Sequence, residues 1–221
     1  YRKKFSPVLI GVTGSVGKTT SKEMIALVLS SSFNTLKTQG NLNNEIGLPK
    51  TLLELNSGHE AAVIEMGMSD FGEIHRLSSA TQPTIGVITN IGFSHIENLK
   101  SQEGILKAKL EILDGMKDDA PLVVNGDDAY LEPLKNKLSR PVYTYGIENE
   151  DVDVRAVNIT AEENSTSFNV IENGEKTCYV TLPCVGLHNV LDALGAYCAG
   201  RLANIEPEKI AEALGKYKTV G

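Results

Sequence analysis

The residues with the clearest chemical potential lie near the start of the chain, in Gly11-Val-Thr-Gly-Ser-Val-Gly-Lys-Thr-Thr20. An apolar run leads into this glycine-rich turn and a helix-like segment follows it, which is the order of a phosphate-binding loop. Gly14 and Gly17 permit the positive φ angles that turn successive backbone N–H groups towards an anion. Lys18 can then reach the β- and γ-phosphates of a nucleotide, and the Thr19 hydroxyl can ligate Mg²⁺.

The motif departs from its strict form, which needs a glycine at position 12, where this chain has Val12. The alternative interpretation is therefore an ordinary glycine-rich turn with a surface lysine. The strand-to-helix context favours the phosphate loop. The residues that we predict to contact the nucleotide here are Thr13, Gly14, Ser15, Val16, Gly17, Lys18, Thr19 and Thr20.

A polar segment rich in amides, Gln39 to Glu45, follows the predicted phosphate loop after one helix and a short β-like piece. Its asparagines are either simple turn formers or groups that orient phosphate oxygens and metal-bound waters. We include Asn44 among the nucleotide-contacting residues on the second interpretation.

Two further strands end on chemically useful side chains. The apolar strand 61–66 carries Glu65 at its carboxyl end, and the strand 84–89 leads into a polar segment that contains His95. The carboxyl ends of parallel strands share one edge of a sheet, where α/β proteins bind ligands. Glu65 is thus a candidate Mg²⁺ ligand, or else a strand-end glutamate bonded to a helix N-terminus. His95 is either a functional group at the same edge or a structural histidine.

The elements that must position these groups alternate between strand and helix. We expect strands at 8–12, 35–38, 61–66, 84–89, 122–125 and 141–145, and helices at 21–31, 48–55, 71–79 and 103–116. This rhythm predicts an α/β fold with a doubly wound, mostly parallel sheet.

The rhythm changes after residue 150. Segments 152–160, 166–172 and 175–182 are β-like, and Asn173-Gly174 between the last two is a strong hairpin signal, so we expect a small antiparallel β appendage. Helices are expected over about 186–202 and 206–217. We accordingly divide the chain into a core at 1–150, the appendage at 151–184 and closing helices at 185–221.

Composition limits the function classes. The chain has 221 residues, 41% of them hydrophobic, and a net charge of −7 without a basic block, which argues against a nucleic-acid surface. The odd number of cysteines, three, has no metal-like spacing and indicates reduced thiols in a cytoplasmic protein. No signal peptide or membrane-length apolar run is visible. The abrupt ends suggest an excised domain, and we expect a monomer.

Taken together, these motifs resemble the central ATPase domain of the Mur ligases over essentially the whole chain. The strings Gly40-Asn-Leu-Asn-Asn-Glu-Ile-Gly-Leu-Pro49, Ile64-Glu-Met-Gly67 and Lys107-Ala-Lys-Leu-Glu-Ile112 are most similar to the branch that joins D-Ala-D-Ala to UDP-MurNAc-tripeptide. The family's phosphate loop departs from the strict motif in the same way.

The resemblance implies roles for individual residues. Glu65 and His95 would be Mg²⁺ ligands, and Lys109 would be the lysine that this family carbamoylates, although by itself it reads as part of a solvated helix face. A carbamate would supply oxygen ligands where an ammonium would repel metals. Asn189 would contact adenine, whereas Asp192 stands where related sequences often have Asn and can accept but not donate a hydrogen bond. Lys18, Lys109 and His95 would be the catalytic residues.

The implied reaction is ATP- and Mg²⁺-dependent amide formation through an acyl phosphate, at a site built between three domains. The amino-terminal domain that holds the UDP group and the carboxy-terminal domain that closes over ATP would lie outside this chain. Two alternatives are another Mur-like ligase, such as a folylpolyglutamate synthase, and a non-catalytic P-loop nucleotide-binding module. The asparagine loop argues against the first, and Glu65, His95 and Lys109 argue against the second.

Overall fold

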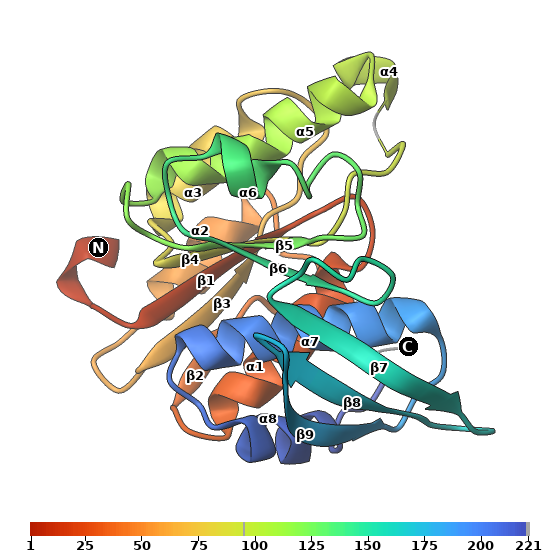
Figure 1. Cartoon of the computed structure of the whole chain (residues 1–221). Helices are drawn as coiled ribbons and strands as arrows, with labels where there is room; N and C mark the ends of the chain where they lie inside the picture. The colour runs from red at the N-terminus through yellow and green to blue at the C-terminus, as the bar shows by residue number, and fades with distance from the viewer. Residues whose placement is uncertain (95, 220–221) are drawn as a thin grey trace.

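The computed structural model describes residues 1–94 and 96–219, and its central feature is a nine-stranded sheet in the order β2-β3-β1-β4-β5-β6-β7-β8-β9 (Figure 1). The strands are β1 Val8–Thr13, β2 Thr35–Lys37, β3 Ala61–Glu65, β4 Ile85–Ile88, β5 Leu122–Asn125, β6 Val142–Gly146, β7 Val154–Ala161, β8 Thr166–Glu172 and β9 Glu175–Leu182. All pairings from β2 to β7 are parallel, and β7 to β9 are antiparallel. The predicted fold class is confirmed.

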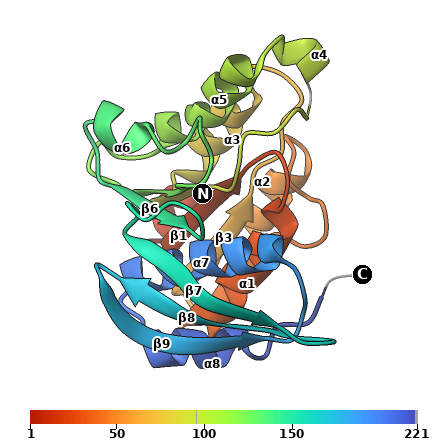
Figure 2. The same ribbon diagram turned by 45° about the vertical axis from the view of Figure 1, so that its right-hand side comes forward.

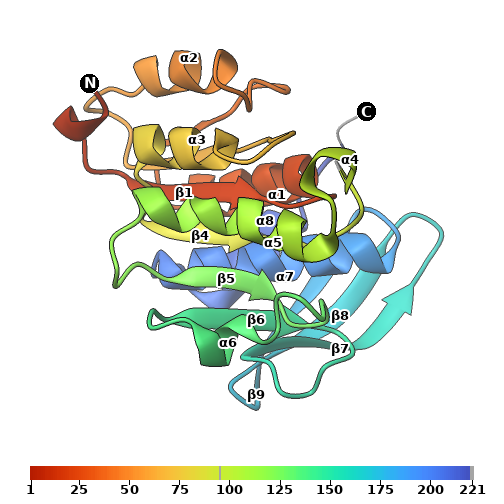
Figure 3. The same cartoon turned by 90° about the horizontal axis from the view of Figure 1, so that it is seen from above.

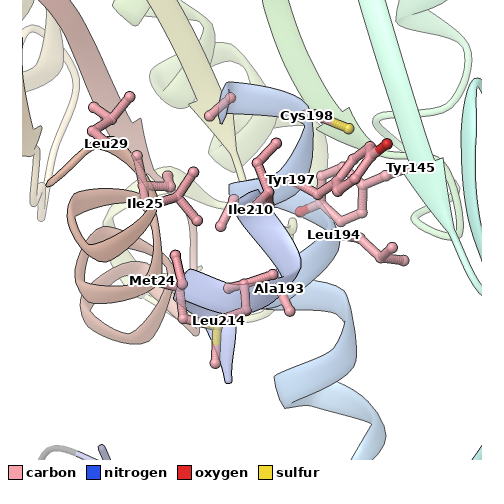
Figure 4. Packing of buried hydrophobic residues seen from close by; sticks show 14 of the residues in the cluster. Met24, Ile25, Leu29, Tyr145, Ala193, Leu194, Tyr197, Cys198, Ile210 and Leu214 are labelled. Carbon is pink, nitrogen blue, oxygen red and sulfur yellow. The ribbon is translucent and has the colours of Figure 1, made fainter. Parts of the chain in front are cut away.

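Helices cover both faces of the sheet. They are α1 Lys18–Ser30, α2 Gly47–Leu53, α3 Glu73–Thr81, α4 Ile96–Leu99, α5 Gln102–Leu110, α6 Leu134–Lys137, α7 Leu187–Leu202 and α8 Pro207–Leu214, with 3-10 turns at Arg2–Lys4 and Glu111–Gly115. Seen from above, α2, α3 and α5 lie side by side over one face (Figure 3). Helices α1, α7 and α8 pack on the other face through the apolar side chains of Figure 4.

The strand sequences fit burial on both faces. In β1, Leu9 packs into the core under α2, α3 and α5, whereas Ile10 and Val12 pack into the core under α1, α7 and α8. In β3, Ile64 packs into the core under α2, α3 and α5, and Val63 packs into the core under α1, α7 and α8. Successive side chains of a strand point to opposite faces, so a strand that is buried on both sides must be apolar throughout.

The antiparallel strands β7 to β9 were predicted, and they continue the main sheet through a short parallel pairing of Tyr145 with Val154 and Gly146 with Arg155. Figure 2 shows them curving around α7 and α8. Asn173 and Gly174 both have positive φ angles, 51° and 84°, as the predicted hairpin turn requires.

Several helix boundaries differ from the prediction, among them those of α1 and α5. Helix α1 begins at Lys18, directly after the glycine turn, rather than at residue 21. The single helix expected over 103–116 is α5 followed by the 3-10 turn, and Ser101 caps its start by accepting a bond from the Gly104 backbone N–H at 3.1 Å. The short helices α4 and α6 were not predicted.

The three cysteines are free and buried, as expected for reduced thiols. Among the described residues, no helix combines the length and the apolar character needed to cross a bilayer.

Candidate functional site

The phosphate-loop geometry predicted from the sequence is present between β1 and α1. Gly14 has a φ of 154° and Gly17 a φ of 82°, so both take the positive values expected of them. The first turn of α1 has no side-chain cap, which leaves its N-terminal backbone N–H groups without a partner from a capping side chain. Because these groups also lie at the positive end of the helix dipole, the turn can bind an anion.

The segment after β4 supports this turn. Thr89 Oγ1 donates to the Val16 carbonyl at 2.7 Å, and Asn90 receives the Val16 backbone N–H at 2.9 Å and donates back to the same residue. A Cβ on Gly14 would lie only 1.8 Å from Thr89 Oγ1, so Gly14 is required by packing as well as by its backbone angle. The polar groups after this strand are visible in the sequence, but their contact with the loop was not predicted.

Lys18 folds back over the loop. Its Nζ donates to the carbonyls of Gly14 at 3.0 Å and Ser15 at 3.3 Å. The side chain also lines a cavity of about 550 Å³ with Asn43, Asn44 and Gly67. Burial lowers the pKa of Lys18, and the negative charge of Glu65 opposes that shift. The ammonium therefore lies beside an open cavity of suitable size for a phosphate group.

Glu65 is only 1% exposed and lies at the carboxyl end of β3, directly beside the phosphate loop. The Thr19 hydroxyl donates to its carboxylate at 3.2 Å, and Asn43 Nδ2 donates to Oε1 at 2.8 Å. Two of the predicted metal ligands, Thr19 and Glu65, are thus adjacent. Asn43, which orients the glutamate, is a site residue that sequence analysis left undecided.

Asn44 has a structural use in the turn before α2. Its Oδ1 accepts the backbone N–H groups of Ile46 at 3.1 Å and Gly47 at 2.8 Å. This oxygen is engaged in turn formation, the first of the two alternatives for the asparagines. The residue still lines the cavity beside Lys18.

Lys109 is buried, not part of a solvated face. The residue is 2% exposed and lies near the end of α5, where burial lowers its pKa to about 7 and repulsion from Lys18 adds to the shift. The Lys109 amine is therefore only partly protonated at neutral pH. The shift also shows that Lys18 and Lys109 lie close enough to interact electrostatically.

His95 lies outside the described residues. Among residues 1–94 and 96–219, no group of three or more His, Cys, Asp or Glu side chains is arranged to hold a metal ion. Within the described part of the chain, the Thr19 hydroxyl is the neighbouring oxygen that could join Glu65 in ligating a cation.

The start of α7 packs against the phosphate loop. Asn189 Nδ2 donates to the Val185 carbonyl at 2.8 Å, so one of its two amide donor hydrogens is already engaged. Asp192 accepts a hydrogen bond from Ser21 Oγ at 2.5 Å, and its carboxylate would lie 2.7 Å from a Cβ on Gly17. Asp192 thus joins α7 to α1 beneath the phosphate loop, which explains why an acceptor is tolerated there.

Burial raises the pKa of Asp192 to about 7, although the Ser21 hydrogen bond opposes the shift. The folded chain thus holds a proton that the unfolded chain releases near pH 4, so stability that is present at low pH is lost as pH rises towards 7. We expect Asp192→Asn to be more stable than wild type, by a margin that grows by roughly 2 to 3 kcal/mol between about pH 5 and about pH 8.

Urea unfolding at the two pH values measures this margin. The exposed Asp118→Asn variant controls for the general loss of a carboxylate. Parallel pH curves for wild type and Asp192→Asn would contradict the prediction.

Comparison with known proteins places this geometry in a family. Residues 12–200 match the Mur ligase middle domain. The chain is 43% identical over its whole length to UDP-N-acetylmuramoyl-tripeptide--D-alanyl-D-alanine ligase of Bacillus subtilis, of which it covers 47%.

Solved structures agree. A MurF crystal structure from Acinetobacter baumannii superposes with a TM-score of 0.91 at 33% identity, over 99% of this chain and 48% of that one. The MurF ligase of Thermotoga maritima in complex with ADP has a TM-score of 0.88 at 30% identity, over 99% of this chain and 50% of that one. The chain spans about half the length of these relatives. It belongs to the Mur ligase family, whose middle domain it contains.

Proposed function

We propose that the chain is the ATP-binding, catalytic middle domain of a ligase that joins D-Ala-D-Ala to UDP-MurNAc-tripeptide. The observation that carries the proposal is the open phosphate loop with the buried Glu65 beside it, together with a buried Lys109 that interacts electrostatically with Lys18 of that loop. The names of the relatives supply the substrate class.

In this proposal residues Thr13 to Thr20 hold the phosphates of ATP. The backbone N–H groups at the start of α1 and the Lys18 ammonium donate to phosphate oxygens, and Lys18 exchanges its carbonyl partners for them. Asn189 contacts adenine from the first turn of α7, and the exposed side chains of Val185 and Leu187 offer an apolar surface to the base. Asn44 contributes from the cavity wall.

The donor set beside the loop fits Mg²⁺. The Glu65 carboxylate and the Thr19 hydroxyl are hard oxygen ligands, and Mg²⁺ is commonly held by one or two carboxylates together with waters and substrate phosphates. We assign Thr19 and Glu65 as ligands, with His95 and a carbamoylated Lys109 as further ones. When bound, the ion neutralises phosphate charge during transfer.

In the proposed reaction the tripeptide carboxylate takes the γ-phosphoryl group of ATP, which gives an acyl phosphate and releases ADP. The amine of D-Ala-D-Ala then displaces phosphate and forms the amide. Lys18 stabilises the negative charge that spreads over the transferred phosphoryl group. Asn43 holds Glu65 in place, and Thr89 and Asn90 hold the phosphate loop. The chain thereby provides a preorganised phosphate-transfer site.

The two substrates need more protein than these 221 residues offer, because the relatives are about twice as long. We propose that the complete enzyme places an amino-terminal UDP-binding domain and a carboxy-terminal domain around this site, and that it acts as a cytoplasmic monomer. The division of the chain at residues 150 and 184 stays a prediction.

The experiment compares the full-length parent with residues 1–221. Given ATP, Mg²⁺, UDP-MurNAc-tripeptide and D-Ala-D-Ala, the parent should yield the pentapeptide, detected by mass spectrometry. Residues 1–221 should bind Mg-ATP weakly and yield none, since an open site neither excludes water nor holds two substrates in attack geometry.

The outcomes separate the alternatives. If the parent binds ATP but forms an amide neither with D-Ala-D-Ala nor with glutamate, it is a nucleotide-binding module. Addition of glutamate to a folate would instead indicate a folylpolyglutamate synthase. Steady pentapeptide formation by residues 1–221 would contradict the need for further domains.

A further inference from the structure

Lys22 is a buried charge that the proposed mechanism does not use. It lies on α1, one turn after Lys18, and its side chain is 0% exposed. Lysine is almost never fully buried without partners. Its ammonium donates to the Gly40 carbonyl at 3.3 Å, lies 3.1 Å from Glu23 Oε1 and lies 3.7 Å from Glu65 Oε2.

Glu23 does not fully neutralise the positive charge of Lys22. The second carboxylate oxygen of Glu23 pairs with Lys37, so one glutamate is shared between two lysines. The charge of Lys22 is therefore available to Glu65, the carboxylate beside the phosphate loop. The same ammonium fixes Gly40, at the start of the asparagine segment that carries Asn43.

The surroundings of Glu65 are consequently rich in cations. Lys22 lies 3.7 Å from its carboxylate, Lys18 interacts with it electrostatically, and Lys109 interacts with Lys18. A divalent ion that approached Glu65 alone would meet this repulsion in a partly buried site, where screening by water is weak. The negative charge of a bound triphosphate would outweigh these lysines, so the site would then attract a divalent ion.

We propose that Lys22 is a positioning residue that holds Glu65 and offsets its charge, so that a divalent cation binds there well only together with nucleotide phosphates. This inference rests on the proposed function of the site. It also explains why α1 carries a buried lysine in addition to the half-buried Lys18: Lys18 binds the phosphates, and Lys22 positions the metal ligand Glu65 and the asparagine segment.

The test measures Mn²⁺ binding without nucleotide, by electron paramagnetic resonance of free Mn²⁺, on residues 1–221. Lys22→Gln removes the charge but keeps a hydrogen-bond donor, and it should bind Mn²⁺ at least about tenfold more tightly than wild type. Lys22→Arg keeps the charge and should resemble wild type. The double variant with Glu65→Gln should lose the gain.

Glu23→Gln provides an opposite test. It frees Lys22 from its anionic partner, so Mn²⁺ binding should weaken below the wild-type value. A purely structural role predicts instead that Lys22→Gln and Glu23→Gln both weaken binding. Because Glu23 is partly exposed, Glu23→Gln can still overturn the inference if Lys22→Gln does not fold, since unweakened Mn²⁺ binding in this variant would contradict it.

Two results would overturn the inference: Mn²⁺ affinity in folded Lys22→Gln that is unchanged or weaker, or affinity in Glu23→Gln that is not reduced. Binding of Mg-ATP by the wild-type chain tests the proposed function separately. If the wild type binds Mg-ATP and the Mn²⁺ shifts are absent, the role of Lys22 is wrong and the nucleotide site stands.

Discussion

Lys18→Ala is expected to abolish measurable Mg-ATP binding without unfolding the chain. Within the described residues, the bonds that the Lys18 ammonium donates go to the carbonyls of its own loop, at Gly14 and Ser15, so its removal takes none of these bonds from the packed core. Its contacts with phosphate would be charge-assisted and therefore strong. The loss should reach at least about a hundredfold in affinity, or about 2.7 kcal/mol.

Titration calorimetry with a non-hydrolysable ATP analogue measures the loss, and circular dichroism checks the fold. Lys50→Ala, which removes an exposed lysine from α2, is the matched control and should bind like wild type. Undiminished affinity in folded Lys18→Ala would refute the assignment of the phosphate loop.

The parts of the site that could be predicted depend on local sequence. Gly14 and Gly17 adopt the positive φ angles expected of them because a tight turn between a buried strand and a helix permits little else. Glu65 lies at the same edge as the loop because the carboxyl ends of parallel strands share one edge. The parallel sheet followed from the alternation of apolar runs and helical segments.

The parts that could not be predicted depend on contacts between distant segments. Asn43 rather than Asn44 reaches Glu65, and nothing in the amide-rich string distinguishes the two. Asp192 turns towards Ser21, 171 positions away in the chain. Lys109 looked exposed by helical periodicity, but in the folded chain it is buried and lies close enough to Lys18 to interact with it electrostatically.

The burial of Lys109 leads to the second large expected effect: Lys109→Ala in the full-length parent should lose most ligase activity. With a pKa near 7, a substantial fraction of the amine is neutral at physiological pH, and only a neutral amine can attack CO₂. The N–C bond forms, one proton leaves, and a carbamate anion replaces a cation. That exchange would remove the repulsion between Lys109 and Lys18 and, in the proposed site, would supply oxygen ligands for the metal ion.

The unmodified lysine also leaves a signature in stability. Because the pKa of Lys109 is depressed in the folded chain, the unfolded chain binds more protons between about pH 7 and about pH 10.5, and this group makes the folded state more stable as pH rises through that window. Residues 1–221 without CO₂ should show this rise, and Lys109→Met should lack it. The effect is independent of catalysis.

Activity and rescue decide the catalytic role. Lys109→Ala should fall by about a hundredfold or more in kcat, and added formate or acetate should restore part of it, because a small carboxylate can take the place of the carbamate. Lys107→Ala, an exposed neighbour on α5, is the control and should keep wild-type activity. Wild-type kcat in Lys109→Ala would exclude a carbamate at this position, whereas a loss without any rescue would leave burial and packing as the function of Lys109 and refute its role as a ligand.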